Sequence, residues 1–257
     1  PPAGVGEERA VVVAVVGQQR VVRHLGPGAE PLVPAQLGRG RLPILLGGDH
    51  CLAIGSVSAV ARHCRETGRK LRVLWLDAHA DFNTHVLTPS GNMHGMPVAC
   101  LCGTGPSELL EIGGTVPAIN PKWVRQIGIR SVDEGEKRLV HKADLEVFDM
   151  RYIDEMGMRH AMELALAMLT EHTHLHVSFD VDFLDPEIAP GVGTTVPGGP
   201  VLDAVKVMAQ NDIGSLVVMD HGKMAGIVTF AEVLRALDDR GGTLGGLRDP
   251  VDGQQPL

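Results

Sequence analysis

Three short apolar runs, each followed at once by acidic or imidazole side chains, dominate the hydrophobic pattern of the chain. They span Leu42–Leu46, Leu71–Leu76 and Leu175–Phe179 and consist largely of Val, Ile and Leu. Continuous apolar runs of this length are typical of strands that are buried on both faces of a parallel sheet. We expect two further strands, an edge strand at Ala10–Val16 and a second one at Trp123–Ile129.

Segments of helical character lie between these runs. Ala53–Arg65 has a helical composition, and apolar residues recur at helical spacing in Met158–Leu169. Alternating strands and helices predict an α/β fold of three layers, with a doubly wound, mostly parallel sheet. Ligands of such folds bind outside the carboxyl ends of the strands, which is where the polar clusters of this chain fall.

Composition and charge argue against nucleic acid and membranes as partners of this protein. The 23 basic and 31 acidic residues give a net charge of −8, which argues against nucleic acid as a partner. No run approaches the roughly 20 apolar residues of a membrane span, and the first residues do not resemble a signal peptide. We therefore expect a cytoplasmic protein without a membrane partner. The four cysteines have no CxxC spacing and are expected to be reduced core thiols.

The strand ends read GGDH at 47–50, DAHAD at 77–81 and DVD at 180–182. Alternate residues of an extended segment project to the same side, so each cluster can direct several side chains at one point. Such a concentration of buried carboxylates would be costly without cations, although strand-end acids satisfied by water are the alternative. An oxygen-rich set with some imidazole favours manganese, and six ligands favour two ions. The candidate ligands are His50, Asp77, His79, Asp81, Asp180 and Asp182.

Four segments resemble signature segments of the ureohydrolase family, and more closely those of arginases, over roughly Leu42–Gly199. They are GGDHCLAIG at Gly47, DAHADFNT at Asp77, SGNMHGMP at Ser90 and SFDVDFLDP at Ser178. The resemblance implies two Mn²⁺ ions, one held by His50, Asp77, Asp81 and Asp180, and the other by Asp77, His79, Asp180 and Asp182. It also implies hydrolysis of a guanidinium substrate, with L-arginine giving L-ornithine and urea; agmatinase and guanidinobutyrase activities are the alternatives.

The same resemblance implies roles for individual residues around the ions. Asp81 would accept a proton from the attacking water, and His94 would shuttle protons, which suits an imidazole. The resemblance also implies contacts with an amino-acid substrate from Asn83, Ser90, Asp133 and Thr194. Without the resemblance, these four would be ordinary loop residues.

After Gly199 the chain departs from the arginase pattern, and the EVNP-like segment whose glutamate pairs with the guanidinium is not found. Val201–Leu237 instead resembles a single CBS repeat, with helices at 202–210 and 230–237 and strands at 215–219 and 225–229. We therefore expect an arginase-like domain over 1–199, poorly defined over 1–40, a CBS-like appendage over 200–240 and a flexible tail over 241–257. CBS repeats act in pairs to bind adenosyl nucleotides, which makes such a nucleotide a candidate ligand.

Two alternatives to an active enzyme remain open at this stage. One is a catalytically impaired fusion protein that binds metal or senses nucleotides, and the other is a truncated or chimeric product that folds poorly. The resemblance further implies a homo-oligomer, either a trimer or a hexamer.

Overall fold

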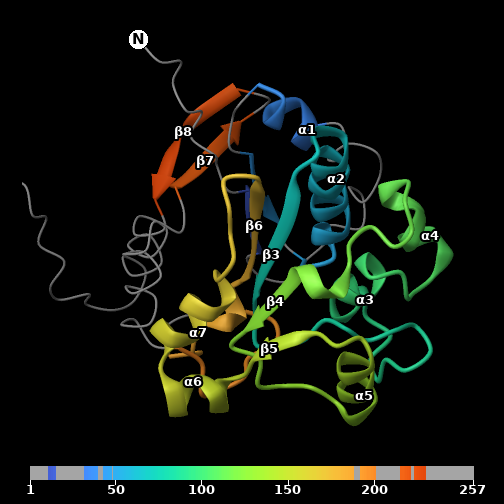
Figure 1. The fold of residues 1–257 in the computed structure, drawn as a ribbon. Coiled ribbons are helices and arrows are strands. Elements are labelled where there is room, and N and C mark those ends of the chain that lie inside the picture. Colours follow the sequence, from blue (N-terminus) through green and yellow to red (C-terminus); the bar gives the residue numbers. More distant parts are fainter. Residues whose placement is uncertain are drawn as a thin grey trace, which may run out of the picture.

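The described part of the chain, in a computed structural model, comprises residues 11–15, 32–39, 43–47, 49–187, 192–200, 215–220 and 223–229. Within it, six parallel strands form one sheet in the order β2-β1-β6-β3-β4-β5, and β7 and β8 form a separate antiparallel pair (Figure 1). The strands are β1 (Val11–Val15), β2 (Ile44–Gly47), β3 (Lys70–Leu76), β4 (Val124–Ile127), β5 (Glu146–Phe148), β6 (Thr173–Asp180), β7 (Ser215–Asp220) and β8 (Lys223–Thr229).

Helices cover both faces of the large sheet and give the fold its three layers (Figure 1). Side chains alternate along β3: Val73 and Trp75 pack with α2, whereas Leu74 and Leu76 pack with α6 and α7. The helices are α1 (Leu32–Leu37), α2 (Leu52–Thr67), α3 (Pro97–Leu101), α4 (Ser107–Leu110), α5 (Glu134–Lys142), α6 (Met150–Met156) and α7 (Met158–Ala165). Among these described helices, none is both long and apolar enough to cross a membrane.

The predicted strands and helices of the arginase-like region are confirmed, except for the position given to the first strand. Ala10–Val16 was expected at an edge, but β1 pairs with β2 on one side and with β6 on the other. A continuous apolar run suits this interior position, because both faces of an interior strand of a parallel sheet are covered. The outer position therefore belongs to β2.

The carboxyl-terminal part is described only in its hairpin. The strands expected at 215–219 and 225–229 are present as β7 and β8. The helices expected at 202–210 and 230–237 and the tail at 241–257 lie outside the described residues. The cysteines are free thiols as expected, and Cys51, Cys64 and Cys100 are buried.

Candidate metal centre

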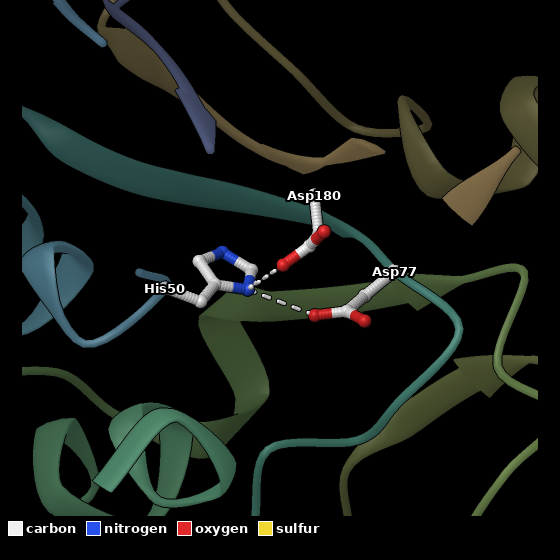
Figure 2. Close-up of side chains that lie close together, drawn as sticks. All are labelled: His50, Asp77 and Asp180. Atoms are coloured by element: carbon white, nitrogen blue, oxygen red, sulfur yellow. Dashed lines mark ion pairs between the residues drawn. The ribbon is translucent and has the colours of Figure 1, made fainter. Parts of the chain in front are cut away.

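His50 begins the site at the turn that leads from β2 into α2. Its ring stacks on the indole of Trp75 with centroids 4.0 Å apart, and Nε2 lies 2.8 Å from Ser178 Oγ in a hydrogen bond. These two contacts turn Nδ1 toward three carboxylates. Nδ1 lies 2.9 Å from Asp77 Oδ2, 3.2 Å from Asp81 Oδ2 and 3.3 Å from Asp180 Oδ2 (Figure 2 shows the first and third). Residues from the ends of β2, β3 and β6 thus converge.

A second group of ligand atoms shares Asp77 with the first. His79 Nδ1 lies 3.5 Å from Asp77 Oδ1 and 3.1 Å from Asp182 Oδ2. The ligand atoms of Asp77, His79 and Asp182 all lie within 4.8 Å of one another, and so do those of His50, Asp77 and Asp180. The shared carboxylate therefore gives the site the layout of two adjacent cation positions.

Unsatisfied buried atoms fit a cation between these side chains. His50 Nδ1 and Asp81 Oδ2 are both buried and have no hydrogen-bond partner among the described residues, although they lie 3.2 Å apart. Buried polar atoms are nearly always paired, so two such atoms facing each other require an explanation. Carboxylate oxygens and imidazole nitrogens are the donors that manganese and similar divalent ions accept, and the residues present fit such ions.

Burial and mutual charge shift the pKa values of this cluster strongly. Burial and the charge of Asp77 raise the pKa of Asp81 to about 8, and burial raises that of Asp182 to about 6. For His79 the effect of burial is outweighed by hydrogen bonds to Asp182 and Asp77, which raise its pKa to about 11. For His50 the effect of burial is outweighed by the nearby carboxylates of Asp180, Asp77 and Asp81, which raise its pKa. Without cations the cluster thus holds protons, which bound cations would displace.

Local hydrogen bonds orient the carboxylates. Asp77 Oδ1 accepts from the backbone N–H of His79 at 2.8 Å, and Asp180 Oδ1 accepts from that of Asp182 at 3.0 Å. Each aspartate thereby closes a two-residue turn at the end of its strand, a conformation that Asp favours. The indole N–H of Trp75 donates to Asp77 Oδ2 at 3.0 Å. The orientation of these carboxylates is therefore built into the strand ends.

The residues expected to contact a substrate do not form one cluster but lie at three places around the site. Asn83 Nδ2 donates to Asp133 Oδ2 at 2.7 Å, so these two lie together. Thr194 Oγ1 instead donates to Asp182 Oδ2 at 2.8 Å, within the metal centre. Ser90 is exposed and forms local hydrogen bonds in its turn. His94 Nδ1 lies 3.6 Å from Asp49 Oδ2, and this contact raises the pKa of His94.

Several supporting residues were not singled out in the sequence. Ser178 and Trp75 fix the ring of His50, and the buried Glu136 accepts from the backbone N–H of Phe82 at 2.8 Å. Arg130 donates to the carbonyls of Asp182, Phe183, Leu184 and Val196, and so holds the loop after β6. Ser178 lies two residues before Asp180, which gives it the same side of β6, so strand alternation could have indicated it.

The sequence profile described as "Arginase family" matches residues 11–224, well over half of the chain. The chain belongs to the arginase family. The match extends beyond Gly199, the boundary expected from the sequence, into the segment for which a CBS-like repeat was expected.

Relatives and solved structures agree with this membership. Arginase from Bacillus caldovelox is 43% identical over 206 residues, which are 80% of this chain and 65% of that protein. Arginase from Brevibacillus brevis is 45% identical over 161 residues, 62% of this chain and 53% of that protein. The crystal structure of arginase from Bacillus subtilis superposes with a TM-score of 0.67 at 36% identity, covering 76% of this chain and 69% of that one. The chain thus spans about half to two thirds of the length of these two curated relatives.

Proposed function

We propose that the chain forms a manganese-dependent ureohydrolase site that cleaves L-arginine to L-ornithine and urea. The observation that carries this proposal is the convergence of two Asp/His groups on one shared carboxylate, that of Asp77. Membership of a family whose similar members bear the name arginase supports L-arginine over other guanidinium compounds.

One ion would be held by His50, Asp77, Asp81 and Asp180, and the other by Asp77, His79, Asp180 and Asp182. Paired divalent cations, when bound, lower the pKa of a water and orient it for attack. The mostly carboxylate donor set supports manganese, and the absence of cysteine ligands argues against a structural zinc site.

The chain's own residues would move protons and hold the substrate. Asp81, whose buried Oδ2 has no hydrogen-bond partner in the part of the chain that the structure describes, would accept a proton at that atom. His94, beside Asp49, would exchange protons between the site and solvent. Asp133 would face the substrate's α-ammonium group, and Asn83 and Ser90 its carboxylate. Thr194 contacts Asp182, which supports a role in orienting that carboxylate, in addition to the substrate contact that the resemblance to arginases implies.

Urea release from L-arginine tests the proposal, measured with and without Mn²⁺ and alongside agmatine and guanidinobutyrate. We expect manganese-dependent release with L-arginine as the best substrate. Asn83→Ala should raise KM for L-arginine and leave that for agmatine unchanged, because agmatine has no carboxylate. Absence of urea from all three compounds in the manganese-loaded protein would contradict the proposal.

The remaining expectations concern the whole chain. We propose a homo-oligomer, trimer or hexamer, and a cytoplasmic location, which the free buried thiols support.

We also propose the boundary near Gly199 and a CBS-like segment over Val201–Leu237. The antiparallel pairing of β7 with β8 is compatible with the strands expected of such a repeat. Calorimetry with AMP tests this segment, and absence of binding would count against nucleotide sensing.

A further inference from the structure

A cavity lies apart from the metal centre, between α5 and the strands β4 and β5 (Figure 1 shows these elements). Its volume is about 450 Å³, which falls within the range of small-molecule sites. None of the candidate metal ligands lines it, although Ala80, which lies between two of them in the sequence, forms part of its wall.

A buried amide without a full set of partners lines this cavity. Gln126 is fully buried on β4, and its Nε2 donates to the backbone carbonyl of Ala80. That bond fixes the orientation of the amide, because a carbonyl can only accept. Gln126 Oε1 is left buried, and no residue in the described ranges gives it a hydrogen bond. An occupant that offers an N–H or O–H group would satisfy it.

The rest of the lining combines aliphatic walls with opposite charges. Val140, Leu145 and Val147 supply apolar surface and are partly buried. Lys137 and Asp149 line the same cavity and are exposed, so their charges lie toward solvent. Asp149 accepts through Oδ1 from the backbone N–H of Tyr152, which leaves Oδ2 for another donor. Arg130 and His141 also line the cavity, and the guanidinium of Arg130 already donates to backbone carbonyls. The lining therefore offers the cation of Lys137, the anion of Asp149, a buried acceptor and an aliphatic surface.

We propose that this cavity binds a small α-amino acid with an aliphatic side chain. The carboxylate pairs with Lys137, the ammonium group donates to Gln126 and Asp149, and the side chain lies against Val140 and its aliphatic neighbours. A single water would satisfy Gln126, but it would use neither the two charges nor the aliphatic wall. The assignment is independent of the proposed hydrolysis.

Calorimetric titration of L-leucine into the full, manganese-loaded chain tests the assignment without reference to turnover. We expect saturable binding that Lys137→Ala weakens at least 10-fold. Val140→Trp, which fills the cavity, should weaken it similarly in protein whose circular dichroism is unchanged. Lys142→Ala is the matched control, because Lys142 is exposed on the same helix and outside the cavity lining, and it should leave the affinity unchanged.

Two analogues of L-leucine test the contributions of its amine and its carboxylate to binding one at a time. 4-Methylpentanoate lacks the amine and isoamylamine lacks the carboxylate, so each should bind at least 10-fold more weakly than L-leucine. Equal binding of 4-methylpentanoate, or no binding of L-leucine to the unaltered chain, would overturn the assignment. So would L-leucine binding that responds to Asn83→Ala and not to Lys137→Ala, because the ligand would then occupy the proposed substrate site.

Discussion

Single side chains around the metal centre hold the carboxylates through donors outside the candidate ligand set. The Thr194 hydroxyl donates to Asp182, and the Trp75 indole donates to Asp77. Hydrogen bonds of this kind orient ligating groups and typically change metal affinity when they are removed. The orientation of the candidate metal ligands therefore depends on residues that do not themselves bind metal.

Thr194→Val tests this dependence, since it removes the hydroxyl and keeps the shape. We expect manganese affinity to fall by about 10- to 100-fold, as for other residues that hold metal ligands. Thr194→Ser, which retains the hydroxyl, should bind manganese nearly as well as the unaltered chain. Calorimetric titration with Mn²⁺ measures both variants. An unchanged metal affinity with a raised KM would instead support a contact with substrate alone.

At the scale of single elements, β6 carries a row of polar residues on one face. His174, His176 and Ser178 alternate along the strand, and all three are buried. Neither ring nitrogen of His176 has a hydrogen-bond partner in the described part of the chain. Burial lowers the pKa of His174 to about 4 and that of His176 to about 3. Both imidazoles are therefore neutral in the folded protein near neutral pH.

These histidines predict a loss of stability in mild acid. Their pKa values are near 6.5 in the unfolded chain, so below that pH the unfolded state takes up protons that the folded state does not. The free energy of unfolding should therefore fall from about pH 6.5 toward pH 4, with up to about 1.4 kcal/mol per pH unit from His176. His176→Leu should reduce that slope in urea unfolding at matched metal content. An identical slope in the variant would contradict this account.

The end of β4 illustrates a position where the fold requires glycine. Gly128 has a φ of 88°, and a Cβ there would overlap the ring of Phe183. Phe183 is fully buried and packs edge-to-face on Phe179, so it has little room to move. This close approach brings the end of β4 against the segment that follows Asp182.

Gly128→Ala should therefore destabilise the protein more than the same change at an open position. Gly114 is the matched control, because its φ is 67° and no atom of a described residue lies within 4 Å of its added Cβ. Gly114→Ala should cost about 1 kcal/mol for the backbone alone, and Gly128→Ala about 1 to 3 kcal/mol more through overpacking. Urea unfolding compares the two variants. Equal losses would show that Phe183 yields without cost.

At the scale of the whole molecule, the sequence was sufficient to predict the strands, from their apolar runs, and the candidate metal ligands, from the polar residues grouped at the strand ends. The apolar runs predicted the strands that precede His50, Asp77 and Asp180, and the convergence of these residues followed from strand ends sharing one edge of a sheet. The order of the strands could not be predicted in full. An interior strand such as β1 differs from an edge strand in its pairing with strands distant in the sequence, which the local sequence does not specify. The three-residue β5 is too short for a periodic pattern. The contacts of Arg130 with the loop after β6 depend on tertiary packing that no local pattern encodes.

The proposed sharing of Asp77 between two cation positions can be tested through the metal content of the chain. Elemental analysis after equilibrium dialysis against Mn²⁺ should give two ions per chain, and Asp77→Asn should lose both. Asp144→Asn is the control: Asp144 is an exposed residue with a φ of 55°, which Asn tolerates, and the variant should retain two ions. One ion or none in the unaltered chain, or two ions retained by Asp77→Asn, would contradict the account.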